Sequence, residues 1–322
     1  MTGNNGNRNS AAGITALFFA ALIWGTTFVA QSVGTDFIEP FTFNFCRDVV
    51  ASVVLIPLYL IMFKQRQKKA GIQNGTASST ETPENRKARI KRELIGGLIC
   101  AFFLMVASVL QQYGIARTSV GKSGFITALY IVLVPVFGIA LKKFPGIKVW
   151  ISVGLALVGL YLLSVNGEMA LEAGDIYLIL SAATFALQIL SVDHFAQTID
   201  GVKLSAMEFV FGAIMCIPTM LAFETPLWSN ILKAAIPVLY AGLMSSGIAY
   251  TLQIFGQKRV EPTLASLIMS LEAVISAISG WLILGQIMTG REIFGSAIMF
   301  CAIILCQMPD RKSVRKTAVD AV

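Results

Sequence analysis

The chain has 322 residues, of which 56% are hydrophobic and only 13% are charged. A soluble domain of this length carries about 25% charged residues to keep its surface hydrated, so the composition excludes an ordinary soluble protein. The net charge is +7. Such a charge could indicate binding to nucleic acid, but the placement of the basic residues favours a membrane partner instead, and we expect no nucleic-acid partner.

Ten apolar segments follow one another along the chain, and a membrane-spanning helix needs about 20 mostly apolar residues. The predicted spans cover residues 12–31, 39–63, 94–116, 121–141, 147–165, 174–194, 203–223, 232–254, 261–284 and 290–308. Continuous apolar runs such as Ala12–Ala30 do not match the alternating strands of about 10 residues that form a membrane β-barrel. The sequence therefore predicts an all-α integral membrane protein with ten transmembrane helices.

The basic residues are unevenly distributed between the loops. With the N-terminus inside, the inner loops and tails hold 20 of the 25 Lys and Arg, and the outer loops hold four. Nine of the twenty lie in one long polar loop, residues 64–93, but the remaining 11 still outnumber the outer four. Because positive charge marks cytosolic loops, we expect both termini to lie in the cytosol. The expected location is the cytoplasmic membrane, which the chain would cross several times.

The second half of the chain resembles the first. A shift of 142 residues overlays 111–138 on 253–280 with seven identities in 28 positions, among them Gln111/Gln253 and Gly138/Gly280. Chance similarity between apolar segments is the alternative. Because each half has five spans, the second copy enters the membrane upside down, so the fold expected is two inverted five-helix repeats around a central cavity.

These boundaries define the expected domains. They are a cytosolic tail (1–11), a first repeat (12–165) that contains a flexible basic cytosolic loop (64–93), a second repeat (174–308) and a cytosolic tail (309–322).

Polar residues recur at helical spacing within several spans. Polar groups in hydrocarbon are costly, so such stripes should face the bundle interior or a water-filled cavity, although Ser and Thr can also serve only to join helices. Aromatic rings would supply apolar walls and amides would orient a ligand. The residues expected to line the cavity are Trp24, Gln112, Tyr130, Gln188, Tyr250 and Gln253.

Three ionisable residues are candidates for coupling or gating. The shift that aligns Pro57 with Pro218 places Arg47 opposite Glu208, which suggests a charge pair between the halves, unless each lies in water near its helix end. Asp48 follows Arg47 directly and should point about 100° away, so we do not expect it to face Arg47. A charged Glu272 is costly at mid-span, which suits proton coupling; the alternative is a structural carboxyl.

Motifs for catalysis are absent from the sequence. Gly121-Lys122-Ser123 lacks the earlier glycine of a phosphate-binding loop, and the five cysteines have no metal-type spacing. We therefore expect no enzyme activity, no cofactor and no metal site. A membrane-embedded enzyme acting on a lipid-linked substrate, a passive channel and a non-transporting sensor are the alternatives.

The chain resembles the EamA-type branch of the drug/metabolite transporter superfamily over residues 13–308. The resemblance rests on ALIWGTTFVAQSVG in the first span, FNFCRDVVASVVLIPL with Arg47 in the second, and the stretch 249–286. Two positions depart from the family pattern: Ala273 follows Glu272 where proline is common, and Gln286 replaces an acid, which leaves Glu272 as the coupling candidate.

This resemblance implies ten helices in two inverted halves and a small organic substrate, often an exported amino acid or related metabolite. A nucleotide-sugar carrier is the alternative substrate class. Its phosphates would need several Lys or Arg in the cavity, and only Arg47 lies deep within a span.

Overall fold

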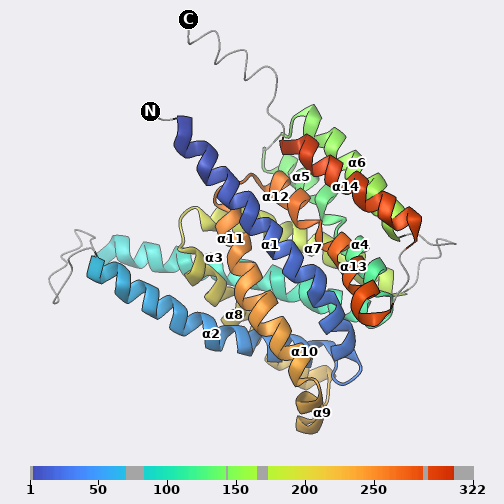
Figure 1. Ribbon diagram of the computed structural model, residues 1–322. Helices are drawn as coiled ribbons and strands as arrows, with labels where there is room; N and C mark the ends of the chain where they lie inside the picture. Colours follow the sequence, from blue (N-terminus) through green and yellow to red (C-terminus); the bar gives the residue numbers. More distant parts are fainter. Residues whose placement is uncertain (1–2, 70–82, 143, 165–172, 286–288, 308–322) are drawn as a thin grey trace, which may run out of the picture.

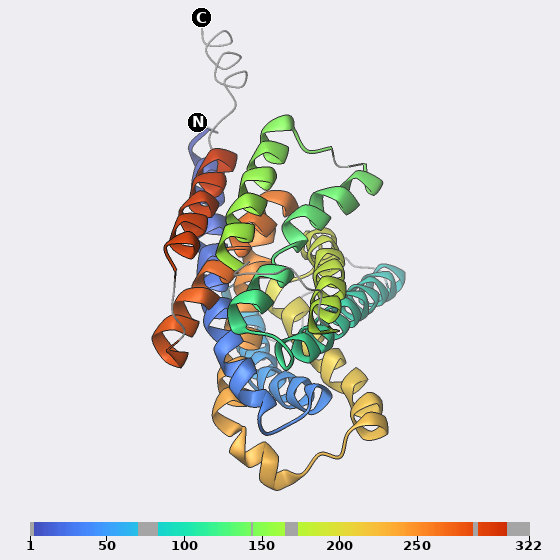
Figure 2. The same cartoon turned by 90° about the vertical axis from the view of Figure 1, so that its right-hand side faces the viewer.

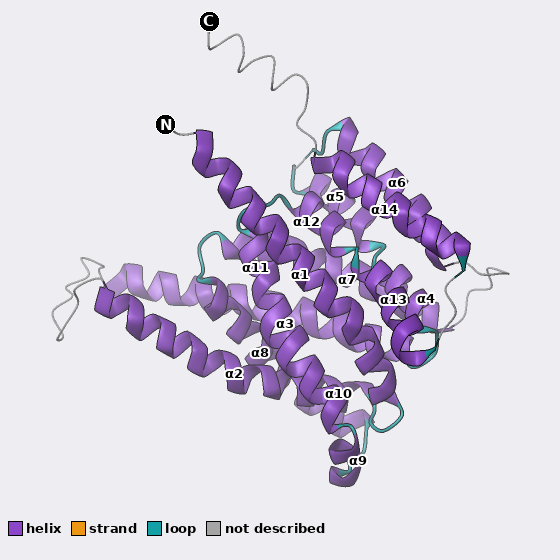
Figure 3. Ribbon diagram, in the orientation of Figure 1, coloured by secondary structure: helices purple, strands orange, loops and turns teal. Residues whose placement is uncertain are grey.

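The computed structural model describes residues 3–69, 83–142, 144–164, 173–285 and 289–307. Across these residues the chain forms helices and connecting loops, without strands (Figure 3). The helices are α1 (Gly3–Thr35), α2 (Pro40–Lys69), α3 (Pro83–Ile115), α4 (Val120–Thr127), α5 (Tyr130–Ala140), α6 (Ile147–Ser164), α7 (Ala173–Ala196), α8 (Gly201–Phe223), α9 (Trp228–Lys233), α10 (Ala235–Tyr240), the π-helix η1 (Ala241–Ala249), α11 (Tyr250–Gln257), α12 (Pro262–Met269), α13 (Glu272–Leu284) and α14 (Gly290–Gln307).

Within the described residues, eight helical stretches are long and apolar enough to cross a membrane. Two shorter apolar helices, Ile147–Leu162 and Ile293–Cys306, bring the apolar segments found there to ten. Large apolar side chains such as Val53, Phe102 and Leu282 are exposed on the outside of the bundle, whereas amides and carboxyls are buried within it. This distribution is the opposite of that in a soluble protein, and it suits a bundle whose outer surface contacts lipid.

The helices pack in pairs that join the two halves of the chain (Figures 1 and 2). Helix α1 packs on α13, α2 on α8, α3 on α7, and α6 on α14. Each of these four pairs takes one helix from each half, and the main buried cluster contains residues of both halves, so neither half forms a separate core. We call the end of the bundle where α1 begins the N side, and the opposite end the far side.

The inverted repeat is visible in the helix boundaries. Helix α1 ends at Thr35 and α7 at Ala196, while α2 begins at Pro40 and α8 at Gly201, so both boundaries differ by 161 residues. The fourth and ninth spans are each broken in the middle, and the breaks differ by the 142 residues of the sequence overlay.

The two breaks also share their hydrogen bonds. Leu129 N–H donates to the carbonyl of Ile126 at 3.2 Å, and Leu271 N–H donates to that of Ile268, also at 3.2 Å. Both are bonds to the third preceding residue, which tighten the chain locally and redirect the helix that follows. The N-termini of the half-helices α5 and α13 therefore lie in the middle of the bundle.

Equivalent arginines close the third and eighth spans. Arg117 donates to the carbonyl of Tyr113 at 2.8 Å, and Arg259 donates to the carbonyl of Phe255 at 2.9 Å. Each guanidinium also lies over the ring of the same residue. A cation at a helix C-terminus satisfies a carbonyl that has no partner within the helix and complements the helix dipole.

The expectation of a flexible loop over 64–93 is wrong in its extent. Helix α2 continues to Lys69 and α3 already begins at Pro83, so the helices extend beyond the apolar spans on the N side (Figure 1). Lys203 of α8 pairs with Glu93 at 2.6 Å, and Arg66 pairs with Asp200, which gives these polar helix ends tertiary contacts. The expected tail 309–322 and position Gln286 lie outside the described residues.

Candidate functional site

A small cavity of about 30 Å³ lies in the middle of the bundle. The residues that line it come from both halves: Trp24, Thr27, Phe28, Gln31, Arg47, Gln111, Thr127, Tyr130, Phe185, Gln188, Ile189, Ser245, Tyr250, Gln253, Met269 and Glu272. This volume is about that of one water molecule and far below the several hundred Å³ of a typical ligand pocket. A metabolite could therefore enter only if the surrounding helices move apart.

Seven of the nine residues singled out from the sequence line this central cavity. They are Trp24, Arg47, Tyr130, Gln188, Tyr250, Gln253 and Glu272. The other two, Gln112 and Glu208, are fully buried behind the wall and contact lining residues through hydrogen bonds.

Aromatic rings form one wall of the cavity. The rings of Trp24 and Tyr250 are 4.8 Å apart at their centroids, and Phe209 packs edge-on against Tyr250 at 5.4 Å. The Trp24 indole N–H has no hydrogen-bond partner among the described residues. The rings make this wall largely apolar and the indole N–H adds a free donor, an arrangement suited to the carbon skeleton of a small organic molecule.

Arg47 is held by two neighbours. Its Nη2 donates to Oγ of Ser108 on α3 at 2.7 Å, and its Nε lies 3.5 Å from Oδ1 of Asp48. The expectation that Asp48 cannot face Arg47 is wrong, because the long arginine side chain folds back far enough to reach the adjacent carboxyl. No ion pair joins Arg47 to Glu208 within the described part of the chain; Glu208 accepts from Gln188 instead.

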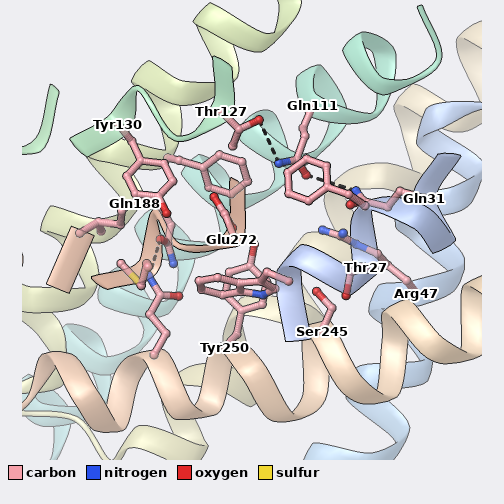
Figure 4. Close-up of a pocket in the computed structure, with 16 residues that line it drawn as sticks. Thr27, Gln31, Arg47, Gln111, Thr127, Tyr130, Gln188, Ser245, Tyr250 and Glu272 are labelled. Carbon is pink, nitrogen blue, oxygen red and sulfur yellow. Dashed lines mark hydrogen bonds between the residues drawn. The ribbon is translucent and has the colours of Figure 1, made fainter. Parts of the chain in front are cut away.

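Two amide networks lie on opposite sides of the cavity (Figure 4). In the first, Gln253 donates to Gln188 at 3.1 Å, and Gln188 donates to Glu208 at 3.0 Å. In the second, Gln31 donates to both Gln111 and Gln112, at 3.2 and 3.0 Å. The network of Gln31 lies beside Arg47, whereas Gln188 lies beside Tyr130, with Glu272 between the two groups.

Several polar atoms of the lining have no hydrogen-bond partner among the described residues. The acceptor is Oε1 of Gln253 and the donor is Nε1 of Trp24. Three more groups have only one weak contact each: the Tyr130 hydroxyl and Oε1 of Glu272 approach each other, and Nε of Arg47 has the 3.5 Å contact with Asp48. Since nearly all buried polar groups in proteins find a partner, this group of atoms needs a ligand or water to satisfy it.

Backbone geometry adds to this polarity. Tyr130 is the first residue of α5 and Glu272 the first of α13, so both begin half-helices that start in the middle of the bundle. A helix N-terminus carries a partial positive charge, which stabilises an ionised carboxyl in the first turn. The break in the ninth span thus lowers the cost of burying Glu272, and it leaves an N-terminus facing the cavity as discontinuous transporter helices do.

A second and much larger cavity, of about 730 Å³, lies on the N side. It begins one helical turn beyond the central cavity on three helices: Val134 follows Tyr130, Asp193 follows Ile189, and Gln257 follows Gln253, each by four residues. Residues four apart share a helix face, so the two cavities lie along one path. We call this larger space the N-side vestibule.

The far side is closed at the matching positions. Phe28, Val29, Ile115 and Val120 form a buried apolar cluster there. Lys122 of α4 and Asp175 of α7 pair above it at 2.9 Å. Glu224, after α8, accepts from Phe41 N–H, Thr42 N–H and the Thr42 hydroxyl, each at 2.7 Å, and so ties α8 to the start of α2.

Some lining residues were missed by sequence reasoning. Gln111 is the repeat partner of Gln253, and Phe185 is the partner of Trp24 under the 161-residue shift, so applying the repeat to the cavity list would have found both. Ser245 could not be found in that way, because it belongs to the π-helix η1, where the five-residue hydrogen bonds rotate the side chains relative to an ordinary helix.

The described residues contain no cluster of three or more His, Cys, Asp or Glu side chains that could hold a metal ion.

Comparison with known proteins identifies the family. The model of the EamA-like transporter family matches twice, over residues 11–165 and 172–307. The chain therefore belongs to the EamA-like transporter family, and it is a multi-pass membrane protein of the drug/metabolite transporter type.

Three relatives illustrate the extent of the similarity. An uncharacterised transporter of Archaeoglobus fulgidus is 26% identical over 297 residues, which are 91% of this chain and 84% of the relative. The uncharacterised transporter YoaV of Bacillus subtilis is 26% identical over 88% of this chain and 92% of its own. The uncharacterised inner membrane transporter YedA of Escherichia coli K12 is 21% identical over 90% and 89%.

The fold also occurs in a solved structure. A protein of known crystal structure superimposes with a TM-score of 0.69 over 92% of this chain and 96% of its own, although the sequences are only 16% identical. At that identity the likeness concerns the fold alone, which is a ten-helix bundle with inverted repeats.

Proposed function

We propose that this protein is a secondary transporter of the cytoplasmic membrane that moves small organic metabolites, amino acids or related solutes, by alternating access. The observation that carries the proposal is a difference between equivalent positions of the two repeats. Phe28, Val29, Ile115 and Val120 pack into a closed cluster on the far side. Three of their repeat partners on the N side, Leu190, Gln257 and Pro262, line the vestibule instead, whereas Ile189 lines the central cavity just as its partner Phe28 does.

This difference supports alternating access because the two repeats could exchange conformations. If the second repeat packed as the first does, the N side would close; if the first opened as the second does, the far side would open. Inverted repeats permit that exchange without a change of fold. With basic loops on the N side, the positive-inside rule puts both termini and the vestibule in the cytosol, where an exporter would load its substrate.

The charges of the central cavity favour a zwitterionic substrate. Arg47 and the free N–H of Trp24 supply donors for a carboxylate, while Glu272 and Oε1 of Gln253 supply acceptors for an ammonium group. Arg47 is the one basic side chain in the lining of the central cavity. A nucleotide sugar would need more cations for its phosphates, so this substrate class is the weaker candidate.

Glu272 is the proposed coupling group, because it is a buried carboxyl that lines the cavity. The same cavity gives no support to catalysis, and neither a cofactor nor a nucleic acid enters the proposal. The partners are the solute, the lipid bilayer and, for coupling, protons.

Counterflow in proteoliposomes tests the proposal. Vesicles containing the purified protein would be preloaded with a mixed pool of amino acids and metabolites, and uptake of each labelled solute would be followed with and without a pH gradient. Saturable exchange that depends on the gradient in the wild type, and not in Glu272→Gln, is the expected result. A linear, unsaturable flux would indicate a channel instead, and no exchange for any solute would refute the proposed substrate class.

Cysteine labelling tests the direction of opening. In a variant whose native cysteines are replaced, Thr263→Cys, at a half-buried position in the vestibule lining, should react with a membrane-impermeant maleimide applied to the cytosolic face. Val29→Cys, which is 6% exposed in the closed cluster, is the control and should resist labelling from either face until a transported solute is supplied. Equal reactivity of the two cysteines without solute would contradict the proposal that the N side is open while the far side is closed.

A further inference from the structure

The chain of hydrogen bonds from Gln253 through Gln188 to Glu208 connects the cavity wall to a buried carboxyl. The three side chains belong to α11, α7 and α8, and they are 1%, 0% and 0% exposed. Each link is a side-chain hydrogen bond, at 3.1 and 3.0 Å. Both ends are open, because Oε1 of Gln253 and Oε2 of Glu208 have no partner within the described residues.

The donor-to-acceptor direction of these two hydrogen bonds depends on the charge of Glu208. An ionised carboxylate only accepts hydrogen bonds, so Gln188 must turn its NH₂ group towards it. The carbonyl of Gln188 then faces Gln253, which in turn must use its own NH₂ group. What remains at the cavity wall is the carbonyl oxygen of Gln253, an acceptor.

The equivalent network on the opposite wall cannot reverse in this way. Gln112 donates to the backbone carbonyl of Gln31 at 3.1 Å, which is a permanent acceptor. This contact fixes the orientation of the Gln112 amide, whose carbonyl therefore accepts from Nε2 of Gln31. The same Nε2 donates to the carbonyl of Gln111, so the NH₂ group of Gln111 must face Thr127. Gln111 and Gln253 occupy the same position in the two repeats, so one amide of the pair is anchored by backbone and the other by a titratable group.

We propose that Glu208 is a positioning residue that sets the hydrogen-bond polarity of the cavity through Gln188 and Gln253. When Glu208 is ionised, Gln253 presents an acceptor to the ammonium group of a ligand. When Glu208 takes up one proton, it donates to the carbonyl of Gln188, both amides turn over, and Gln253 presents a donor, which repels an ammonium group. No covalent bond other than the new O–H is formed, and the proton comes from the medium.

The surroundings of Glu208 permit this change. Asp48 of α2, paired with Arg47, approaches α8 next to Gly212, and it lies near Glu208 as do Cys100 of α3 and Tyr250 of α11. Both states hold one hydrogen bond between these side chains: the ionised carboxylate accepts from the NH₂ group of Gln188, and the protonated carboxyl, after Gln188 turns over, donates to its carbonyl instead. The inference rests on the proposed function for its ligand, but the reorientation of the two amides requires no ligand and can be measured in the protein alone.

Nuclear magnetic resonance of side-chain NH₂ groups tests the switch without any ligand. The full chain, labelled with ¹⁵N-glutamine and held in lipid nanodiscs, would be titrated with acid; Gln188→Glu, Gln253→Glu and Gln111→Glu assign the signals. The signals of Gln188 and Gln253 should shift together with one midpoint, while that of Gln111 stays constant. In Glu208→Gln both shifts should vanish. A shift of Gln188 alone, shifts of all three residues, or no shift would overturn the proposal.

A second variant guards against misfolding of Glu208→Gln. Gln188→Met interrupts the chain and leaves Glu208 free to titrate, so the Gln253 signal should lose its pH response; a response that persists would overturn the proposal. For a solute with an ammonium group found by counterflow, apparent affinity should fall about tenfold or more through the same midpoint, as expected for a hydrogen bond to a charged group. Unchanged affinity would overturn the link to the ligand, whereas absence of counterflow would bear only on the proposed function.

Discussion

The contact of Glu224 with the start of α2 should be a main source of stability on the far side. The carboxylate is 6% exposed and accepts three hydrogen bonds of 2.7 Å, two of them from the N–H groups of Phe41 and Thr42. These N–H groups have no partner within the helix, and a negative charge at a helix N-terminus is also favoured by the helix dipole. One side chain therefore serves as the cap of a 30-residue helix that it does not belong to.

The cost of removing this cap can be worked out from its parts. Loss of an N-terminal capping side chain costs about 1 kcal/mol, and a hydrogen bond to a charged group contributes about 1.5–3 kcal/mol, with incomplete additivity. Glu224→Ala should therefore lower the free energy of unfolding by about 3 kcal/mol. Glu224→Gln, which keeps one acceptor oxygen and loses the charge, should lower it by about 1 kcal/mol.

Thermal unfolding of the detergent-solubilised protein at neutral pH, followed by size-exclusion chromatography, provides the assay. For a chain of this length, about 3 kcal/mol corresponds to a fall in Tm of about 4 °C. The matched control is Glu261→Ala, since Glu261 is exposed and precedes α12 without a side-chain capping bond. Equal Tm values for Glu224→Ala and the wild type, or equal losses for Glu224→Ala and the control, would refute the reasoning.

Three further predictions concern other parts of the bundle. Gly25→Ala should destabilise the protein by about 1–3 kcal/mol, because the new Cβ would lie 2.4 Å from Cβ of Ile275 on α13. The control is Gly154→Ala, whose new Cβ would have no neighbouring atom within 4 Å, and its Tm should be unchanged or raised. Arg47→Ala should lower the free energy of unfolding by about 3–5 kcal/mol, because it leaves Asp48 buried without its partner. Adding Asp48→Asn should recover part of that stability, and a double variant in which the two losses simply add would contradict the pairing. Partial burial raises the pKa of Asp200, but hydrogen bonds from Arg66 and the Lys203 backbone outweigh it and hold the pKa below the usual 3.8. The stability that Asp200 contributes is therefore present above the unfolded-state pKa of about 3.9 and is lost as the pH falls through the lower folded-state pKa. Acidification should lower the Tm of Arg66→Ala less than the Tm of the wild type. An equal fall in the two proteins would count against a stabilising pair of Arg66 and Asp200.

The sequence by itself determined the class and symmetry of the fold. Ten apolar segments fix ten helices, because a segment in hydrocarbon must satisfy its backbone hydrogen bonds internally. Identities such as Gln111/Gln253 and Arg117/Arg259 fix the repeat, and the odd number of spans fixes its inversion. Polar residues within the spans predicted much of the cavity lining, since such residues are too costly to face lipid.

Only the tertiary structure decided how those side chains pair. Arg47 contacts Ser108 and Asp48 rather than Glu208, because the contacts of a long side chain depend on which helices pack beside it. Helix α2 continues to Lys69, since tertiary contacts on the N side extend it beyond its apolar segment. The repeat predicts two equal ends, yet one is closed by Phe28 and its neighbours and the other is an open vestibule. A sequence with inverted symmetry permits either end to open, and only side-chain packing in a given conformation decides which one does.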